Sequence, residues 1–303
     1  METKIQRSFE ENRGDYIMKE ITILSGKGGT GKTTITASFA ALAQNAVTAD
    51  CDVDAPDLHM LLHPIPFKVQ DFIGPKLAKI DENVCVNCGL CQKACQFDAI
   101  KDFQIDPIHC EGCGVCEIVC PEKAISLHDR ISGQAFLSKT GFGFMSHALL
   151  SPGGANSGKL VTLVRNNAQM LAKNNNCDLI LIDGSPGIGC PVIASIAGVN
   201  LALIITEPTL SGIHDLKRAM QLLSHFNVPS LVCINKYDLN LKNTEKIEKF
   251  CSEKNVDVIG KILFDPIVTK AMVAETPVIE YLPESKVSKS IEQIWQQVIL
   301  RLE

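Results

Sequence analysis

The sequence lacks three features that would place the protein on nucleic acid or at a membrane. It has no excess of basic residues, because its 303 residues carry a formal net charge of −5, and basic surfaces are what bind phosphate backbones. It has no uninterrupted apolar run long enough to cross a bilayer. Its N-terminal residues contain no apolar segment of the kind that forms a signal peptide. We therefore expect a cytoplasmic protein that binds neither nucleic acid nor membrane.

The missing signal peptide also decides how the thirteen cysteines are interpreted. Frameworks of disulfide bonds form in oxidising compartments, which a protein without such a peptide does not reach. Eight of the cysteines lie between Cys85 and Cys120. This clustering indicates metal binding.

Strands and helices alternate through most of the chain. Near-continuous apolar segments such as EITILSG, LILID and SLVCIN predict a mostly parallel sheet that helices cover on both faces. The alternation breaks in a turn-rich, cysteine-dense segment, so we expect residues 18–63 and 128–303 to form one α/β domain. Residues 64–127 are predicted to form an α+β domain inserted into it. Residues 1–17 are polar and aperiodic, and we expect a disordered extension or a start upstream of the natural one.

A phosphate-binding loop follows the first predicted strand. Gly26–Thr33 reads GKGGTGKT and matches the P-loop pattern G-x-x-x-x-G-K-[ST], with a strand before it and a helix after it. Its glycines let backbone N–H groups point at phosphate oxygens, and the helix N-terminus adds a favourable dipole. We expect Lys32 to reach the β- and γ-phosphates, and the hydroxyl of Thr33 to bind Mg²⁺. The nucleotide-binding residues expected here are Gly28, Gly29, Thr30, Gly31, Lys32, Thr33 and Thr34.

A second lysine, Lys27, stands at the start of this loop, where it cannot easily fold back onto its own phosphates. With it, the segment Lys27–Thr33 resembles the K-G-G-x-G-K-[ST] pattern of the deviant Walker A ATPases, which include MinD, ParA, the Mrp-type scaffold ATPases and the nitrogenase iron protein. The resemblance covers essentially the whole chain outside the insert. It implies that Lys27 crosses a dimer interface, and that ATP joins two subunits in a sandwich. The dimer would be a homodimer or a heterodimer with a related ATPase.

Further motifs of this family follow in order. Asp50 and Asp52 come after the second predicted strand and resemble the switch I aspartates; the resemblance implies that Asp52 orients the attacking water. Asp183 ends the strand LILID, where the family has its Walker B aspartate. The catalytic residues expected by resemblance are therefore Lys27, Lys32 and Asp52, and the expected Mg²⁺ ligands are Thr33, Asp50 and Asp183.

The sequence identifies the base-binding residues less clearly, because one segment fits two patterns. Asn235–Asp238 reads NKYD and resembles the segment that holds the family's adenine-contacting asparagine. The same four residues also fit N-K-x-D, the pattern by which GTPases read guanine. The deviant Walker A context favours ATP, with Asn235 as the contact to the base. Asp265, in the next predicted strand-to-helix loop, is a second candidate contact.

The cysteine-dense segment contains the same motif twice. Cys85–Cys95 and Cys110–Cys120 each read C-x2-C-x2-C-x3-C, which is the repeat of bacterial ferredoxins with two [4Fe–4S] clusters. In that repeat the fourth cysteine of each motif binds the other cluster. Structural zinc is the alternative, but zinc sites rarely use this doubled order. The expected ligands are Cys85, Cys88, Cys91 and Cys120 for one cluster, and Cys110, Cys113, Cys116 and Cys95 for the other.

The remaining cysteines lack such spacing. Cys190 lies seven residues after Asp183, the same offset as a cluster ligand of the nitrogenase iron protein, but the preceding helix-start loop offers no second cysteine. We interpret Cys190 as a small buried hydrophobic residue, and whether it has a metal role stays open. The same interpretation applies to Cys51, Cys177, Cys233 and Cys251.

The C-terminal segment VSKSIEQIWQQVILRLE predicts a helix with one apolar face. In MinD a C-terminal amphipathic helix binds membrane. Here cationic and acidic residues are equal in number, two of each, so we expect the apolar face to pack on the sheet. The residues of that face are Val287, Ile291, Ile294, Trp295 and Val298.

Two functions fit these features. One is an ATPase, possessing redox activity, that couples nucleotide-driven dimerisation to electron transfer through two [4Fe–4S] clusters to a partner protein. The other is an ATPase that assembles or delivers a metal cofactor, because the chain resembles MinD-type ATPases with an inserted ferredoxin domain, including those of the orange protein complex. A weaker alternative to both is a MinD- or ParA-like positioning ATPase with redox-sensing clusters. Complete cysteine sets favour stable clusters and hence electron transfer; the sequence names neither donor nor acceptor.

Overall fold

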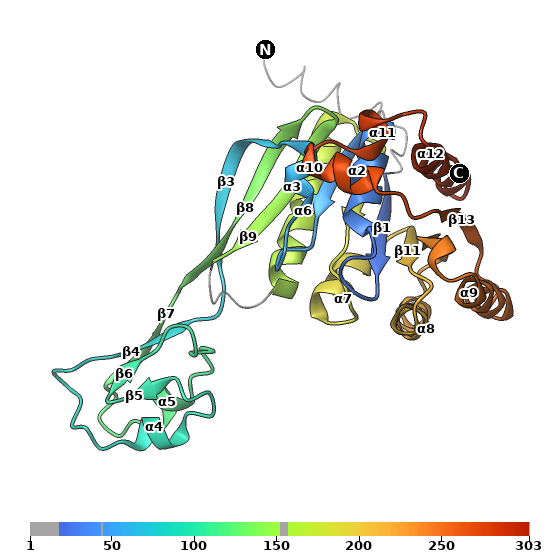
Figure 1. Ribbon diagram of the computed structural model, residues 1–303. Coiled ribbons are helices and arrows are strands. Elements are labelled where there is room, and N and C mark those ends of the chain that lie inside the picture. Colours follow the sequence, from blue (N-terminus) through green and yellow to red (C-terminus); the bar gives the residue numbers. More distant parts are fainter. Residues whose placement is uncertain (1–17, 44, 152–156, 303) are drawn as a thin grey trace, which may run out of the picture.

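The computed structural model describes residues 18–43, 45–151 and 157–302. The predicted disordered extension, residues 1–17, lies outside these ranges. Figure 1 shows two parts: a large lobe built around a central sheet, and a small lobe that projects from one edge of this sheet.

A nine-stranded sheet forms the centre of the large lobe. Its strands are β1 (Lys19–Ser25), β2 (Ala46–Asp50), β3 (Ile65–Ile73), β8 (Ile131–Thr140), β9 (Gly143–Leu150), β10 (Leu179–Asp183), β11 (Leu201–Thr206), β12 (Ser230–Asn235) and β13 (Val258–Ile262). Their order is β13-β12-β11-β1-β10-β2-β9-β8-β3. Neighbours from β13 to β9 pair in parallel, whereas β8 and β3 add antiparallel at the edge. The predicted mostly parallel α/β sheet is confirmed.

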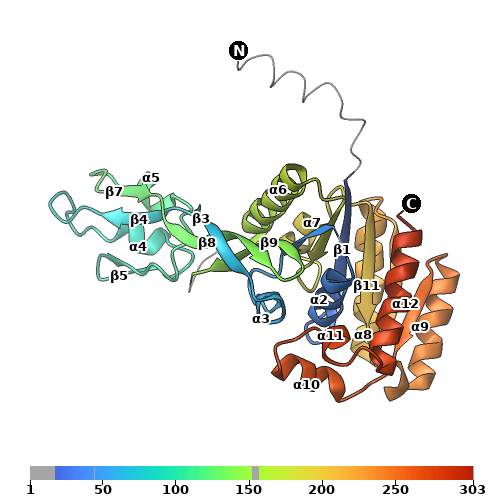
Figure 2. The ribbon, with the colours of Figure 1, turned by 90° about the horizontal axis from the view of Figure 1, so that it is seen from above.

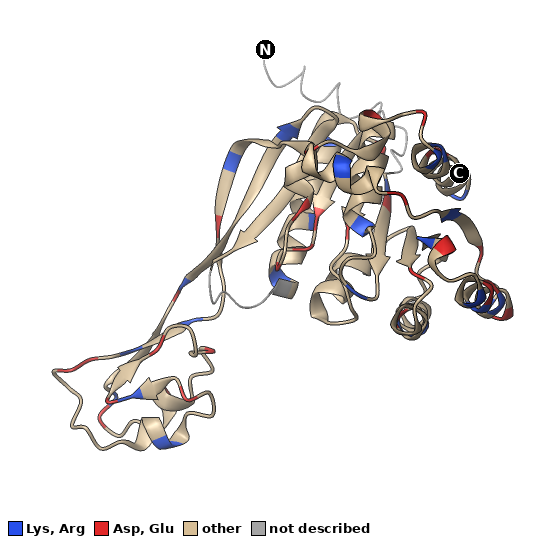
Figure 3. Ribbon diagram, in the orientation of Figure 1, with Lys and Arg blue, Asp and Glu red and all other residues tan. Residues whose placement is uncertain are grey.

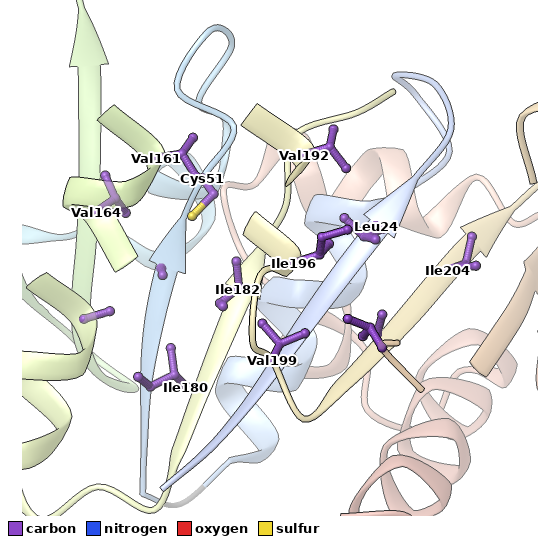
Figure 4. Packing of buried hydrophobic residues seen from close by; sticks show 14 of the residues in the cluster. Leu24, Cys51, Val161, Val164, Ile180, Ile182, Val192, Ile196, Val199 and Ile204 are labelled. Atoms are coloured by element: carbon purple, nitrogen blue, oxygen red, sulfur yellow. The ribbon is translucent and has the colours of Figure 1, made fainter. Parts of the chain in front are cut away.

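Helices cover both faces of this sheet. One face carries α6 (Ser157–Asn175), α7 (Cys190–Ile196), α8 (Leu210–His225) and α9 (Leu241–Glu253). The other carries α2 (Lys32–Leu42), α3 (Leu58–Leu62), α10 (Ile267–Val273), α11 (Val278–Tyr281) and α12 (Lys286–Leu300). Figure 4 shows the first of these two cores, where strand residues such as Ile182 meet apolar side chains of α6 and α7. Two apolar layers therefore hold the sheet, which explains why its inner strands are apolar at successive positions.

The C-terminal helix packs on the sheet, as its apolar face predicts. Val287, Ile291, Ile294 and Val298 of α12 are each at most 1% exposed. The ring of Trp295 lies against that of Phe39 in α2, with 4.9 Å between the ring centroids. Within the described ranges, no helix is both long enough and apolar enough to cross a membrane.

The small lobe spans Leu77–His128 and joins the large lobe through a neck, defined here as residues 74–76 and 129–130. Figure 2 shows it from above, lying beyond the edge strands. Its elements are the antiparallel pair β4 (Leu77–Ile80) and β7 (Ile125–His128), the pair β5 (Ile100–Lys101) and β6 (Gln104–Ile105), and helices α4 (Leu90–Ala94) and α5 (Val115–Ile118). The lobe therefore has the mixed α and β content expected of the insert.

The start of the insert differs from the predicted boundary at residue 64. Residues Ile65–Ile73 form β3, which pairs with β8 as part of the large sheet. The chain thus leaves the large sheet at the neck, about ten residues later than the change in composition. The division into domains itself stays a prediction.

Burial of the remaining cysteines agrees with the sequence in four of five positions. Cys51, Cys177, Cys233 and Cys251 are each at most 4% exposed, and Figure 4 shows the Cys51 sulfur among apolar side chains. Cys190 is exposed, so its predicted burial is wrong. It is the first residue of α7 and precedes the positions, such as Val192 and Ile196, that turn toward the core.

Candidate nucleotide site and cysteine cavities

A cavity of about 550 Å³ opens at the carboxyl ends of the parallel strands, where open α/β sheets bind their ligands. Its volume is in the range of small-molecule sites. Segments that follow β1, β2, β10, β12 and β13 meet there. Of the predicted site residues, those lining the cavity are Gly28, Gly29, Thr30, Gly31, Lys32, Thr33, Thr34, Asp52, Asn235 and Asp265.

Two glycines give the phosphate-binding loop its shape. Gly29 and Gly31 have φ values of 77° and 89°, in the left-handed region that favours glycine. A Cβ atom on Gly31 would lie 2.4 Å from Nδ2 of Asn235. That amide donates a hydrogen bond of 2.7 Å to the carbonyl of Thr30. The loop is therefore fixed by a side chain from the opposite wall, and the N-terminus of α2, at Lys32, offers its N–H groups to an anion.

Lys32 and Asp183 form the charged centre of the site. Nζ of Lys32 lies 2.9 Å from Oδ1 of Asp183 and 3.5 Å from Oδ2 of Asp52. Burial lowers the pKa of the Lys32 ammonium, but the carboxylates of Asp183 and Asp52 outweigh it and raise this pKa above its usual value. Thr33 and Thr36 donate to Asp183 over 2.9 and 2.8 Å. Lys32 therefore stays charged beside the phosphate-binding loop.

Asp50 is a buried carboxylate with an unused oxygen. It is 1% exposed and pairs in register with Asp183 across β2 and β10. Its Oδ1 accepts from the backbone N–H of Asp52 over 3.1 Å, while Oδ2 has no hydrogen-bond partner among the described residues. Burial, and then the neighbouring Asp183, raise the pKa of Asp50 well above its usual range. Burial also raises the pKa of Asp52.

These oxygens fit a divalent cation. The Thr33 hydroxyl, the free oxygen of Asp50 and the carboxylate of Asp183 are the hard ligands that Mg²⁺ prefers. A bound cation would offset the cost of keeping Asp50 ionised in a buried position. The structure thus brings together the three residues predicted to bind Mg²⁺.

Lys27 lies outside the cavity and is folded back onto its own chain. Its Nζ atom lies 3.3 Å from Oε2 of Glu207, 3.4 Å from Oγ1 of Thr209 and 3.3 Å from Oγ of Ser211. Oε1 of Glu207 also lies 2.6 Å from Nζ of Lys236. Although burial raises the pKa of the Glu207 carboxyl, Lys236 and Lys27 outweigh it and lower this pKa. Glu207 was not among the residues predicted from the sequence, although its position directly after the buried strand β11 is a signal for it.

Two aspartates shape the end of the cavity where the base is predicted to bind. Oδ1 of Asp238 accepts from the backbone N–H of Phe264 over 2.6 Å, and Oδ1 of Asp265 accepts from that of Ile267 over 2.9 Å. Asp265 lines the cavity, whereas Asp238 does not. In an N-K-x-D motif the aspartate carboxylate contacts guanine. Here the carboxylate of Asp238 accepts from the backbone of Phe264 instead, and this favours adenine as the base.

The cysteines of the small lobe line two separate cavities. One, here called the proximal cavity, is lined by Cys95, Cys110, Cys113 and Cys116. The other, here called the distal cavity, is lined by Cys85, Cys88, Cys91 and Cys120. Each cavity takes three cysteines from one motif and the fourth from the other motif, which is the grouping that the spacing predicts. All eight thiols are free of disulfide bonds.

No three His, Cys, Asp or Glu side chains in the described part of the chain converge closely enough to hold a single metal ion. The cysteines of each cavity surround a space and do not meet at one point.

Known proteins share the fold of this chain. Residues 21–278 match the model of the CobQ/CobB/MinD/ParA nucleotide binding domain. The chain belongs to this family. As a MinD/ParA-type P-loop protein, it is a nucleotide-binding ATPase.

Relatives of this chain match nearly its whole length. An uncharacterized protein of Methanocaldococcus jannaschii is 37% identical over 289 residues, covering 94% of this chain and 98% of the relative. The iron–sulfur cluster carrier protein of the same organism is 23% identical and covers 95% of this chain and 86% of the relative. Among solved structures, the septum site-determining protein MinD of Pyrococcus horikoshii, complexed with Mg-ADP, is similar with a TM-score of 0.60. It is 19% identical and covers 93% of this chain and 96% of its own, and this likeness concerns the fold alone.

Proposed function

We propose that this ATPase couples nucleotide-driven dimerisation to electron transfer through two [4Fe–4S] clusters to a partner protein. The observation that carries the proposal is the division of eight cysteines between two cavities, four in each, on a lobe attached to the nucleotide-binding sheet. Two neighbouring clusters would provide a path for electrons through the lobe, which a single cluster would not.

The residues of the small lobe fit such clusters. Thiolates are the ligands of iron–sulfur clusters, and four of them surround each cubane. Each thiolate of a cubane binds a different iron, so the four sulfurs need not converge on one point. Bound in the two cavities, the clusters would supply one-electron redox chemistry.

The nucleotide site would work through the residues that line it. Lys32 and the N–H groups at the start of α2 would neutralise the phosphates, while Thr33, Asp50 and Asp183 would hold Mg²⁺. Asp52, 3.5 Å from Lys32, would orient the attacking water. These roles follow from the geometry together with the family's motifs.

Dimerisation would require Lys27 to leave its own chain. In this structure its ammonium group contacts Glu207, Thr209 and Ser211, and Lys27 does not line the nucleotide cavity. The side chain is about one-third exposed, so it can turn away without unfolding the loop. We propose that it then reaches the nucleotide of a second subunit, in a homodimer or in a heterodimer with a related ATPase.

The surface of the small lobe points to the charge of the partner protein. Residues 77–128 contain eight acidic residues and four lysines, so the lobe carries most of the chain's net negative charge. Figure 3 shows acidic positions distributed over the lobe. A partner with a basic docking face would therefore associate faster with this lobe, and the association would weaken as salt is added.

The proposal can be tested with protein purified without oxygen. The reduction of the clusters is followed by EPR at controlled potentials, with no nucleotide, with Mg·ATP and with a non-hydrolysable analogue. Electron coupling predicts that nucleotide shifts a midpoint potential or the rate of reduction, and that Lys32→Ala removes this shift. Midpoint potentials and reduction rates that are the same in all three conditions would contradict the coupling.

A second function, the assembly or delivery of a metal cofactor, is favoured by one specific comparison. The iron–sulfur cluster carrier protein of M. jannaschii aligns with 95% of this chain. Delivery requires that a cluster leave the protein. Loaded protein mixed with an apo-ferredoxin and a chelator that traps free iron would then reconstitute the acceptor, faster with ATP. Retention of both clusters through many ATP turnovers would argue for electron transfer instead.

A further inference from the structure

The two cysteine cavities lie at different distances from the large lobe. β4 and β7 begin their pairing at Leu77 and His128, directly next to the neck. The proximal cavity is lined by Ala78 and Leu127, the next pair along this ladder. The distal cavity is lined by Ile125, which pairs two residues further from the neck. Because a strand rises about 3.3 Å per residue, this difference amounts to about 7 Å.

The loop that carries the proximal cysteines also contacts the neck directly. Gly112 lies between Cys110 and Cys113 and has a φ of 64°. A Cβ atom at this glycine would lie 2.1 Å from the carbonyl oxygen of Lys76, so the loop and the neck meet backbone to backbone. A displacement of Lys76 would therefore be transmitted to the two cysteines on either side of Gly112.

Arg130, on the other strand of the neck, makes a second contact with the same loop. Its guanidinium donates a hydrogen bond to the carbonyl of Pro107. Its own carbonyl accepts from the N–H of Gly74 over 3.1 Å, which ties the two sides of the neck together. Among the residues that the structure describes, no hydrogen bond links residues 85–91, the loop of the distal cysteines, to the neck.

We propose that nucleotide binding acts on the proximal cysteine site and leaves the distal site unaffected, with Arg130 and Gly112 as the positioning residues that transmit the change. This inference rests on the proposed function and deepens it. The route begins at α3, where Met60 and Leu61 line the nucleotide cavity. It continues through β3, which starts at Ile65 and ends at the neck.

The test compares the backbone of the two loops in the loaded, oxygen-free protein. Hydrogen exchange of residues 106–114 and 82–91 is measured without nucleotide and with a non-hydrolysable ATP analogue, and the potentials of both clusters are followed by EPR. We expect the analogue to change exchange in residues 106–114 and to shift one of the two potentials. Substituting Cys88→Ser in the distal site and Cys113→Ser in the proximal site assigns the signals.

The variant Arg130→Ala should lose both responses while nucleotide affinity is kept, because Arg130 lies outside the nucleotide cavity. Arg130→Lys should restore part of the response, since lysine can still donate to a carbonyl. Lys79→Ala is the control, because it removes one positive charge from an exposed position in β4. Iron content and the unshifted distal signal show that the lobe of each variant is intact.

The outcomes separate the inference from the function on which it rests. A response in residues 82–91, or an equal response in both loops, overturns the inference while the coupling of nucleotide to redox chemistry stands. The inference is overturned in the same way if Arg130→Ala responds like the unaltered protein. If neither loop nor either potential responds to nucleotide, the inference and the proposed function both fail.

Discussion

Replacing Asp50 by asparagine should have opposite effects on the nucleotide-free and the nucleotide-bound protein. Asp50 is almost fully buried, and its Oδ2 has no hydrogen-bond partner among the described residues. Burying such a group costs about 1–3 kcal/mol, and more when it is charged. Asp50→Asn removes the charge and keeps the shape. We therefore expect the nucleotide-free variant to be more stable than the unaltered protein by about 1–3 kcal/mol.

The pH dependence of this gain follows from the direction of the pKa shift. Burial and Asp183 raise the pKa of Asp50 in the folded state. A carboxyl group with a raised folded-state pKa stabilises the fold while it is protonated, at low pH, and this contribution is lost as the pH rises through the raised pKa. The advantage of Asp50→Asn should therefore grow from acidic to neutral pH.

With nucleotide present, the same substitution should be harmful. If the free oxygen of Asp50 helps to hold Mg²⁺, its loss removes a charged ligand from the cation. The stabilisation that Mg·ADP gives beyond ADP alone should then shrink or vanish in Asp50→Asn. Urea unfolding of each variant, with ADP alone and with Mg·ADP, measures both effects. The control is Asp54→Asn, which removes an equal charge from an exposed position lining the same cavity.

This reasoning is refuted if Asp50→Asn destabilises the nucleotide-free protein and still gains full stability from Mg²⁺. In that case the carboxylate would be held by favourable interactions of its own, and the cation site would lie elsewhere. Equal behaviour of Asp50→Asn and Asp54→Asn would mean that net charge near the cavity, and not the buried position, decides the outcome.

Three other substitutions test separate parts of the structure. Glu207→Gln should free Lys27 and strengthen ATP-dependent dimerisation about fivefold, because a partly exposed ion pair contributes roughly 1 kcal/mol. Sedimentation with a non-hydrolysable analogue measures this effect. Weaker dimerisation would show that Glu207 supports the dimer. Gly31→Ala should weaken nucleotide binding measured by calorimetry, because its Cβ would collide with the amide of Asn235 at a φ of 89°; unchanged affinity would contradict this. His147→Gln should make the protein less sensitive to acid. Burial lowers the pKa of His147 to about 4, so titration of this residue alone should cost the unaltered protein about 1.4 kcal/mol of stability per pH unit between pH 6.5 and 4. An equal change of the urea midpoint between pH 7 and pH 5.5 in both proteins would refute it.

The sequence predicted the cysteine grouping because that grouping depends on local spacing. Three cysteines within seven residues can surround one cavity only if their loop wraps it, and a fourth cysteine from the other motif completes the set. The phosphate-binding loop was predictable for the same reason, since one continuous segment from Lys27 to Thr33 supplies its donors and its lysines.

Features that depend on distant contacts could not be predicted in this way. β3 was assigned to the insert because the chain was interpreted as turn-rich and cysteine-dense from residue 64 onward. Ile65, Phe67 and Val69 are 74%, 56% and 51% exposed, so burial gives this edge strand no clear pattern. The contact of Glu207 with Lys27 joins residues that are 180 positions apart. Only the folded sheet brings them together.

The position of α3 makes it the decisive element for any link between nucleotide and clusters. The helix has five residues, of which Met60 and Leu61 line the nucleotide cavity, and β3 begins three residues after it ends. His63, at its C-terminus, also contacts the carbonyl of Glu275, in the loop after α10, over 2.7 Å. Because α3 is so short, we expect it to move as one unit. The fixed φ of Pro64 restricts the connection between α3 and β3. If closure of the cavity moves Asp52 and the residues after it, β3 must move as well, unless the contact between His63 and Glu275 holds α3 in place. His63→Ala should therefore enlarge the response of the small lobe to nucleotide, and a smaller response would show that this contact carries the movement instead of resisting it.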